Sequence, residues 1–270
     1  MNVFWKNTSL LDRYLTNYKF QKNKKVADVV LLGSKSIDLD NFPNLKGIFR
    51  VGVGLDNVPV KQAEDRGIKV QITSRNTNEF IFEETANFTC YLIFRMLYSD
   101  LGDINSWKVN VRSSAIHLKK LLIIGKGNIG KRVESKMKAF MDVDTFDVIE
   151  NNHKDLMQKT SAADCISIHI PLTDDNVNFF DKKMLSMMKD DSVLINTSRA
   201  AIVSETALYN EIKSGRIRSA FDVFWEKPYN GKLKTFYPQG FFMTPHVASK
   251  CENYIRSAAK DFKSFIKELE

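Results

Sequence analysis

The sequence predicts an α/β protein made of two doubly wound parallel sheets, and two observations lead to this fold class. Short runs of β-branched residues alternate with longer stretches of helical periodicity, and each run ends in a turn signal. The chain has 270 residues, which is more than one hydrophobic core usually supports, so about two domains are expected. Hydrophobic residues at 43% and charged residues at 27% are typical of a folded protein.

The elements follow from these patterns. The predicted strands are 26–32, 48–51, 70–72, 121–124, 143–146, 165–168, 193–196 and 242–244. The predicted helices are 80–97, 129–140, 206–214 and 251–269. A polar stretch at 99–117 separates the two groups of strands, so a domain boundary belongs near it. Because no strand follows the last helix, we expect that helix to pack back on the first domain, which gives domains of 1–90 plus 247–270 and of 91–246.

The apolar patterning excludes a membrane span. No apolar run approaches the roughly 18 residues that a membrane helix needs, and the longest are short pieces such as 29–32 and 121–124. Residues 1–8 contain neither an uninterrupted apolar stretch nor a small-residue cleavage site, so a secretory signal is not expected. We therefore expect a cytoplasmic protein without a membrane partner.

The three cysteines indicate neither a metal site nor a disulfide framework. Cys90, Cys165 and Cys251 lie 75 and 86 positions apart, which is far from the spacing of a CxxC ligand pair. We expect them to be reduced, buried thiols, and we expect no metal.

The chain is basic, with 40 Lys and Arg against 32 Asp and Glu and a formal net charge of +8. Such a surplus could attract nucleic acid, an anionic membrane or a small acidic substrate. Only Lys19, Lys22, Lys24 and Lys25 cluster, and no motif of a nucleic-acid-binding module accompanies them. We therefore interpret the cluster as a solvated face and expect no nucleic-acid partner.

The strongest local signal is a glycine pattern directly after the predicted strand 121–124. The segment Gly-Lys-Gly-Asn-Ile-Gly at 125–130 is a GxGxxG motif that opens a predicted helix. Gly125 permits a tight turn, Gly127 lets the backbone approach a pyrophosphate, and Gly130 lets the helix pack closely on its strand. The phosphates would meet the start of the helix at Asn128 and Ile129. The second domain is therefore predicted to be a Rossmann dinucleotide-binding domain.

A carboxylate at the end of the next strand indicates which dinucleotide binds. Asp147 follows the predicted strand 143–146 and lies 22 positions after Gly125, where it can accept hydrogen bonds from a ribose diol. The same carboxylate would repel a 2′-phosphate, so NAD is favoured over NADP. The alternative is an aspartate that only ends a strand and binds no ligand.

Several further segments read together resemble the D-isomer-specific 2-hydroxyacid dehydrogenases. The resemblance spans roughly residues 26–259, and the first matching segment looks most like the phosphoglycerate dehydrogenase branch. The matching segments are 50–57, 125–130, 167–173, 195–199, 222–224 and 244–248. The resemblance implies that 1–90 plus 247–270 is the substrate domain, an abbreviated flavodoxin-like unit, and that 91–246 binds NAD.

The resemblance also implies roles for individual residues at the substrate. Arg199 matches the arginine that clamps the substrate carboxylate and polarises the keto or hydroxyl oxygen. His246 matches the histidine that gives a proton to the carbonyl oxygen as hydride arrives. Backbone amides around Val53 and Gly54 match the loop that holds the other side of the carboxylate. Lys35 lies near the position where the phosphoglycerate branch binds phosphate, which hints at an acidic substrate.

Other positions match the residues that line the cofactor in this family. Asp222 matches the residue that meets the nicotinamide amide, and His169, Pro171 and Thr197 match cofactor-lining loops. For His169, a purely structural role at the end of a buried strand is the alternative.

One departure from the family pattern concerns the partner of the catalytic histidine. The family usually has Asp-Val-Phe, then two further residues, then Glu-Pro. In this chain the position of that glutamate is occupied by Lys227. The glutamate normally favours the protonated histidine, so either Glu226 replaces it from one place earlier or the relay is lost. A lysine there would disfavour a second positive charge, so reduction would fade at a lower pH.

The resemblance thus implies an NAD-dependent oxidoreductase that transfers hydride between the nicotinamide and a small D-2-hydroxy acid or 2-keto acid. The alternative is an NAD-binding family member without turnover that acts as a sensor or partner-binding module. A homodimer is expected, because the helix 80–97 and the segment through Trp107 correspond to the family's dimer-forming arm. Phe88, Leu92 and Phe94 are expected to supply the apolar surface of that contact.

Overall fold

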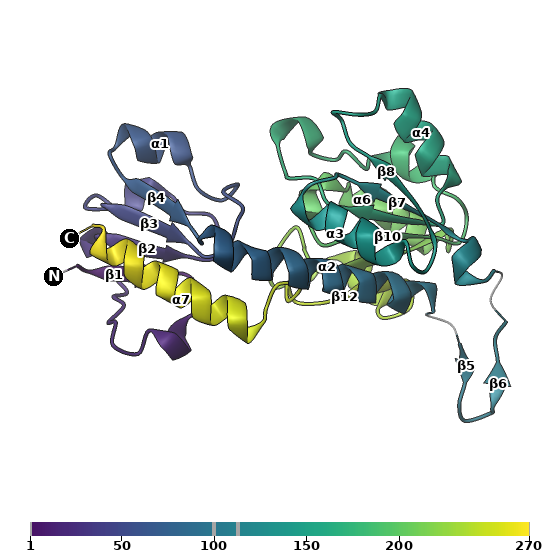
Figure 1. Ribbon diagram of the computed structural model, residues 1–270, viewed down its shortest axis with the longest axis horizontal. Coiled ribbons are helices and arrows are strands. Elements are labelled where there is room, and N and C mark those ends of the chain that lie inside the picture. The colour runs from purple at the N-terminus through teal and green to yellow at the C-terminus, as the bar shows by residue number, and fades with distance from the viewer. Residues whose placement is uncertain (1, 99–100, 112–113, 270) are drawn as a thin grey trace. The chain divides into compact units, whose positions relative to one another are not determined.

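The strands of the protein form two parallel sheets with helices packed against them, which confirms the predicted α/β class (Figure 1). The structure is a computed structural model that describes residues 2–98, 101–111 and 114–269. The strands of the first sheet are β1 (Phe4–Lys6), β2 (Val29–Leu32), β3 (Gly47–Arg50) and β4 (Lys69–Ile72). The strands of the second sheet are β7 (Lys120–Ile124), β8 (Asp142–Phe146), β9 (Cys165–Ile168), β10 (Ser192–Asn196), β11 (Ile217–Phe221) and β12 (Phe241–Met243).

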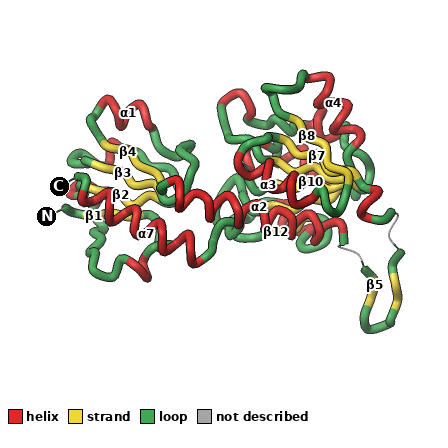
Figure 2. The backbone as a smooth tube through the Cα atoms, in the orientation of Figure 1, coloured by secondary structure: helices red, strands yellow, loops and turns green. Residues whose placement is uncertain are grey.

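A short antiparallel pair and the helices complete the described elements (Figure 2). The pair is β5 (Gly102–Asp103) with β6 (Lys108–Val109). The helices are α1 (Val60–Asp65), α2 (Arg75–Leu97), α3 (Asn128–Met137), α4 (His153–Ala162), α5 (Lys182–Ser186), α6 (Glu205–Lys213) and α7 (Glu252–Lys267). The chain divides into two compact units, one ending at Ile81 and resuming at Ser249, the other covering Phe82–Ala248.

The first unit holds a parallel sheet in the order β1-β2-β3-β4. On the other edge of β1, the Phe4 carbonyl accepts from Gln21 N, and Phe20 forms an isolated parallel bridge with Phe4. With this bridge counted as a reduced edge strand, the order becomes the flavodoxin-like 2-1-3-4-5. The edge strand next to β1 is thus a single bridge.

The last helix, α7, covers one face of this first sheet. Tyr254, Ala258, Phe262 and Phe265 recur at helical spacing and are fully buried, and they pack with sheet residues such as Phe49. The helix belongs to the first unit although the whole second unit separates it in sequence.

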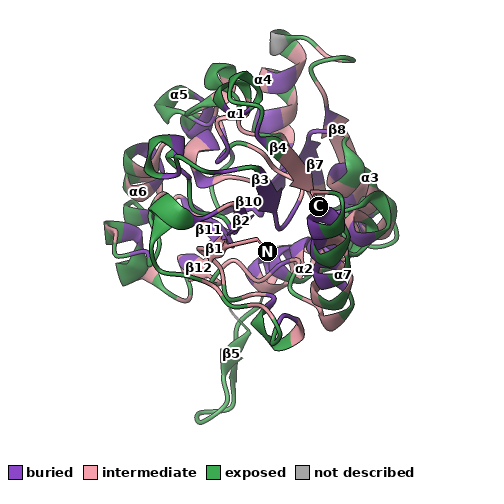
Figure 3. Ribbon diagram, turned by 90° about the vertical axis from the view of Figure 1, so that its left-hand side faces the viewer, coloured by how far each residue is buried: buried purple, intermediate pink, exposed green. Residues whose placement is uncertain are grey.

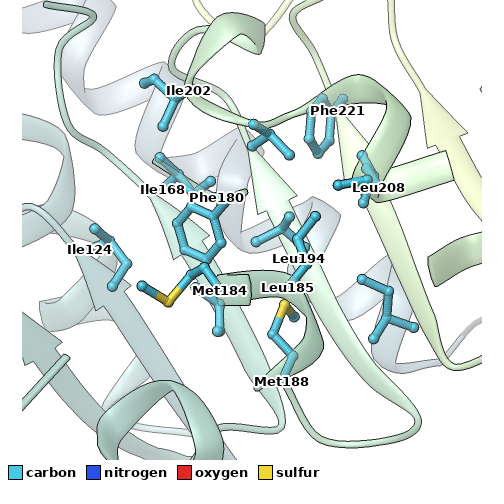
Figure 4. Packing of buried hydrophobic residues seen from close by; sticks show 14 of the residues in the cluster. Ile124, Ile168, Phe180, Met184, Leu185, Met188, Leu194, Ile202, Leu208 and Phe221 are labelled. Carbon is cyan, nitrogen blue, oxygen red and sulfur yellow. The ribbon is translucent and has the colours of Figure 1, made fainter. Parts of the chain in front are cut away.

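The second unit contains six parallel strands in the order β12-β11-β10-β9-β7-β8. The order reverses between β7 and β9, which makes this the topological switch point, and ligands of open α/β sheets bind at the carboxyl ends of strands there. The inner strands β7, β9, β10 and β11 are almost wholly buried, whereas the edge strand β8 is only partly buried (Figure 3, buried residues in purple). Phe180, Leu194 and Phe221 lie in the core on one face of the sheet (Figure 4).

The sequence patterns miss several elements for identifiable reasons. Strand β1 spans only three residues, and β11 carries the polar and small residues Ser219 and Ala220, which are nonetheless fully buried in mid-sheet. The short helices α1, α4 and α5 were also not predicted. Helix α2 begins at Arg75, five residues before the predicted start, where the Ser74 hydroxyl accepts from Thr77 N.

One of the three residues predicted to supply a dimer contact on α2, Leu92, is not available for it, whereas Phe88 and Phe94 remain partly exposed. Leu92 is fully buried in the core of the second unit, and Phe88 and Phe94 pack against that core. In contrast, Trp107 in the β5–β6 segment is 81% exposed.

All three cysteines are free. Cys165 is buried as predicted, whereas Cys90 and Cys251 are only partly buried. Burial raises the pKa of Cys90 to about 11, so its thiol stays protonated at neutral pH. Within residues 2–98, 101–111 and 114–269, no helix is long and apolar enough to span a bilayer, and no cluster of three metal-binding side chains occurs.

Candidate active site

The glycine motif lies at the topological switch point, between β7 and α3. Gly125 directly follows β7 and has a φ of +97°, and a β-carbon on it would lie 2.9 Å from the His169 carbonyl oxygen. A β-carbon on Gly130 would lie 1.9 Å from the Gly125 oxygen, so this position requires glycine for helix α3 to pack on the loop. The loop is thus shaped by close backbone contacts that only glycine allows.

The start of α3 fits the pyrophosphate of a dinucleotide. Gly127 is the N-cap of the helix and has no side-chain cap, which leaves the first amides of Asn128 and Ile129 without a side-chain acceptor at that cap. No heavy atom lies within 4 Å of a β-carbon built on Gly127, so the space beside it is open. An anion in that space would meet the positive end of the helix dipole.

Asp147 follows β8 and faces the same loop. Its Oδ2 accepts from Lys126 N at 2.8 Å and its Oδ1 from Ile149 N at 3.1 Å. These backbone hydrogen bonds lower the pKa of Asp147, so the carboxylate is ionised throughout the neutral range. Each carboxylate oxygen retains a lone pair for a ribose hydroxyl. The Lys126 ammonium is held by Glu150 at 2.7 Å.

The next two strand ends carry His169 and Thr197. His169 Nε2 lies 2.8 Å from the Ser167 hydroxyl, and its backbone N donates to the Ile124 carbonyl. Burial lowers the pKa of His169 to about 3, so this side chain is neutral and suited to a structural or lining role. The Thr197 hydroxyl is buried and lies 2.9 Å from that of Thr89 on α2. Pro171 is exposed, and its carbonyl accepts from Asn176.

Arg199 lies just beyond β10 in a loop whose backbone is held by the Asn196 side chain. Buried Asn196 accepts from Ser198 N through its side-chain oxygen and donates to the Arg199 carbonyl at 2.8 Å. Arg199 Nη1 donates to the Ser198 carbonyl at 2.9 Å. Asn196 therefore holds the backbone that presents the guanidinium.

Asp222 fixes the loop that carries His246. Its carboxylate is 1% exposed and accepts from the Thr244 hydroxyl at 2.6 Å, from Val247 N at 2.8 Å and from Ala248 N at 2.9 Å. These three donors bracket His246, whose φ of +59° lies in the left-handed region that costs a non-glycine residue about 1 kcal/mol. Besides its predicted contact with the cofactor, Asp222 thus holds the backbone of the histidine.

The structure distinguishes the two candidate partners of His246. Lys227 Nζ lies 2.7 Å from His246 Nδ1. The Glu226 carboxylate instead accepts from Asn230 N at 3.0 Å. Lys227 therefore occupies the position at the imidazole that the resemblance assigns to glutamate.

A cavity of about 560 Å³ lies beside this pair, within the second unit. Aromatic and apolar side chains such as Tyr229, Tyr237 and Met243 line it together with Lys227 and His246. Tyr229 Oη donates to Glu205 at 2.7 Å, and its ring stacks on Phe224 with 5.1 Å between the ring centroids. These two contacts hold the Tyr229 side of the cavity in place.

The predicted substrate residues Val53, Gly54 and Lys35 lie in the first unit, on loops that follow β3 and β2. Buried Asn57 ties these loops together, because its Nδ2 donates to the Gly33 and Lys35 carbonyls at 2.8 and 2.9 Å. The Lys35 side chain is exposed.

Sequence reasoning missed the side chains that support these loops. Asn57, Asn196 and Ser198 lie in the matching segments 50–57 and 195–199, but no role was assigned to them, because their roles depend on hydrogen bonds to neighbouring loops. A signal was present for Asn57 and Asn196, because a polar side chain next to a buried apolar strand is shielded from water and needs a hydrogen-bond partner in the protein.

Comparison with known proteins finds relatives over most of this chain. Residues 99–248 match the sequence model described as D-isomer specific 2-hydroxyacid dehydrogenase, NAD binding domain. A glyoxylate reductase of Korarchaeum cryptofilum is 31% identical over 245 residues, which cover 82% of this chain and 73% of the reductase. A hydroxypyruvate reductase of Thermotoga maritima is 29% identical over 259 residues, which cover 91% of this chain and 82% of the reductase.

The fold likeness extends over the whole chain. A crystal structure of D-lactate dehydrogenase from Aquifex aeolicus, complexed with NAD and lactic acid, superposes with a TM-score of 0.82 and covers 99% of this chain. The match covers 96% of that dehydrogenase at 22% sequence identity, so it shows a shared fold.

Proposed function

Because this chain belongs to the D-isomer specific 2-hydroxyacid dehydrogenases, we propose that it reduces a small 2-keto acid to the D-2-hydroxy acid. NAD is the cofactor, and the chain is an NAD-dependent oxidoreductase of this family. Glyoxylate and hydroxypyruvate are the proposed substrate class, since relatives at 29–31% identity carry the names of their reductases.

The observation that carries this proposal is the set of side chains at the carboxyl ends of the second sheet. Bound NADH supplies the hydride. Asp147 holds the adenosine ribose through its ionised carboxylate, and the start of α3 at Gly127 receives the pyrophosphate. Arg199 pairs with the substrate carboxylate and polarises the carbonyl, while His246 supplies the proton to its oxygen.

Other assignments made from the resemblance stay predictions. Val53, Gly54 and Lys35 are proposed to bind substrate, and His169, Pro171, Thr197 and Asp222 to line the cofactor. The first unit is proposed as the substrate domain and the second as the NAD-binding domain.

We also propose a homodimer, and its support lies in the β5–β6 segment. Leu101, Ile104, Trp107, Val109 and Val111 are each more than half exposed there. A cluster of this kind on the surface of a monomer is typical of a protein–protein contact.

Turnover with a panel of keto acids tests the proposed activity. The protein is expected to oxidise NADH with at least one of glyoxylate, hydroxypyruvate, pyruvate and 2-oxoglutarate. His246→Gln is expected to lower kcat by about 10² to 10⁴, the usual contribution of a general acid, with NADH affinity unchanged in calorimetry. Tight NADH binding without turnover on any of the four would support the sensor alternative instead.

A further inference from the structure

The contact between Lys227 and His246 identifies the nitrogen of the imidazole that carries the proton. Lys227 Nζ lies 2.7 Å from His246 Nδ1. An ammonium group has three donors and no acceptor, so Nζ donates and Nδ1 accepts. A neutral imidazole that accepts at Nδ1 carries its hydrogen on Nε2. His246 therefore offers an N–H donor at the nitrogen that is not in contact with Lys227.

Building on the proposed reduction, we propose that Lys227 and His246 work as one acid, in which the lysine returns to the imidazole the proton that the imidazole gives to the substrate. When hydride reaches the carbonyl carbon, the π pair of the C=O bond moves to the oxygen and takes the proton from Nε2. One Nζ proton passes to Nδ1, so the imidazole stays neutral and the lysine becomes an amine. The starting state returns when Nε2 takes a proton from water and Nδ1 gives its proton back to Nζ, which restores both the ammonium and the original tautomer.

The second proton transfer is required by the state of the imidazole. A neutral imidazole that lost its Nε2 proton without replacement would become an imidazolate anion, which is a far stronger base than any group expected in the site. A carboxylate beside Nδ1 avoids this by favouring a doubly protonated ring. The ammonium achieves the same proton count differently, because it keeps the proton on Nζ until it is needed.

The fold places the two side chains together by strand pairing. Strands β11 and β12 are parallel neighbours, with Phe221 opposite Met243, so their carboxyl ends meet at one edge of the sheet. Lys227 follows β11 and His246 follows β12. The Asp222 carboxylate fixes the loop on both sides of His246, which keeps the imidazole in range of Nζ.

The other ionisable groups around the cavity are accounted for separately. Lys234 and Tyr237 line the same cavity as His246 and are exposed. The Tyr229 hydroxyl donates to Glu205, and burial raises the pKa of Tyr229, so it stays neutral. The hydrogen bond that His246 Nδ1 accepts is the one from Lys227.

The pH dependence of reduction separates the paired acid from a lone histidine. A lysine that only disfavours a second positive charge would make reduction fade at a lower pH, as expected from the sequence. The paired acid reverses this direction: wild-type kcat/KM for keto-acid reduction is expected to persist above the ordinary range of histidine, because the pair keeps its transferable proton on lysine. In Lys227→Met, kcat/KM is expected to decline as the pH rises above about 6.5. At pH 8 it should be about thirtyfold lower than at its maximum, because only about one isolated imidazole in thirty is protonated there. Lys234→Met, which removes an equal charge from the same cavity, is the matched control and keeps the wild-type profile.

Two further variants separate proton supply from positioning. Lys227→Arg keeps a cationic donor at Nδ1 but does not release its proton, so the rate at pH 8 is expected to stay as low as in Lys227→Met. Lys227→Glu should reduce the keto acid faster at neutral pH than Lys227→Met, because its carboxylate favours the doubly protonated imidazole. Full recovery in Lys227→Arg would overturn the proton transfer from lysine.

A readout that needs no turnover tests the contact itself. In nitrogen-15 spectra of histidine-labelled protein at pH 7.5, the His246 ring, assigned with His246→Gln, is expected to show hydrogen on Nε2 and none on Nδ1. Hydrogen on Nδ1, or a Lys227→Met profile identical to the wild type, would overturn the proposal. Absence of turnover together with hydrogen on Nε2 would contradict the proposed function and leave the paired geometry intact.

Discussion

Asp147 is the residue on which we predict the preference for NADH over NADPH to depend. Backbone hydrogen bonds from Lys126 and Ile149 lower its pKa, so the carboxylate is fully charged where the ribose would bind. NADH should bind at least about tenfold more tightly than NADPH, which corresponds to about 1.4 kcal/mol. Asp147→Ala should narrow this ratio, as measured by calorimetry with both cofactors. The control is Asp190→Ala, which removes an equal charge just before the amino end of β10 and should leave the ratio unchanged. Equal affinities of the wild type for NADH and NADPH would contradict the assignment.

His169 makes a separate prediction about acid stability. Its pKa is about 3 in the folded state, because burial disfavours the charged ring, whereas the unfolded chain binds a proton below about pH 6.5. The unfolded state therefore gains more protons as the pH falls from 6.5 towards 3, and folding stability is lost in that window.

Urea unfolding at pH 7 and pH 4.5 measures this loss. His169→Leu should reduce the difference in unfolding free energy between the two pH values by about 2 kcal/mol. His117→Leu, at an exposed histidine of the same unit, is the control and should not change the difference. An unchanged difference in His169→Leu would mean that His169 is protonated in the folded protein.

At this scale the sequence identified positions better than contacts. The motifs placed Asp147, Arg199 and His246 at strand ends because each follows a recognisable apolar run. They could not decide between Glu226 and Lys227, because adjacent residues in a turn point in different directions and only the path of the chain fixes which one meets His246.

At the scale of elements, the β7–α3 junction separates binding from packing. A β-carbon on Gly127 meets no atom within 4 Å, whereas one on Gly130 would clash with the Gly125 oxygen at 1.9 Å. Gly127→Ala should keep the melting temperature and weaken NADH binding about tenfold, because the methyl group occupies the space for the pyrophosphate. Gly130→Ala should lower the unfolding free energy by about 1–3 kcal/mol. Thermal unfolding with NADH titration measures both, and equal behaviour of the two variants would contradict the assigned roles.

The elements themselves were predictable to different degrees. Strands β7, β9 and β10 were found because they are short, mostly apolar runs buried on both faces. Strand β11 was missed because it contains the polar residue Ser219. Ser219 is tolerated in the core because its hydroxyl donates to the Leu194 carbonyl, and hydrophobic periodicity does not reveal such a contact. The reduced edge at Phe20 was likewise invisible, because a single bridge leaves no pattern.

For the whole molecule, the assembly prediction depends mainly on the exposed apolar residues of the β5–β6 segment. Light scattering at micromolar concentration should give twice the 31.0 kDa of one chain. Replacing exposed Ile104 and Trp107 by serine should give the mass of a single chain, because it removes apolar surface from the proposed contact. Val177→Ser changes an exposed apolar residue elsewhere and should leave the mass doubled. A wild-type particle of 31.0 kDa would rule out the dimer.

The domain organisation was foreseeable from the order of motifs, since the last helix has no strand to follow. The division in the structure falls at Ile81 and Phe82, inside α2, and a continuous helix gives no composition signal at such a point. The polar stretch at 99–117 marked instead the segment around β5 and β6.

The central claim, NAD-dependent reduction of a small 2-keto acid to its D-isomer, is tested most directly by following the hydride. The protein is incubated with pyruvate and with hydroxypyruvate, using NADH whose transferable hydrogen is deuterium, and the products are analysed by mass and chirality. The account predicts deuterium on the carbinol carbon of a D-2-hydroxy acid, formed far more slowly by His246→Gln. An L-isomer, a product without deuterium, or undiminished turnover in His246→Gln would contradict it.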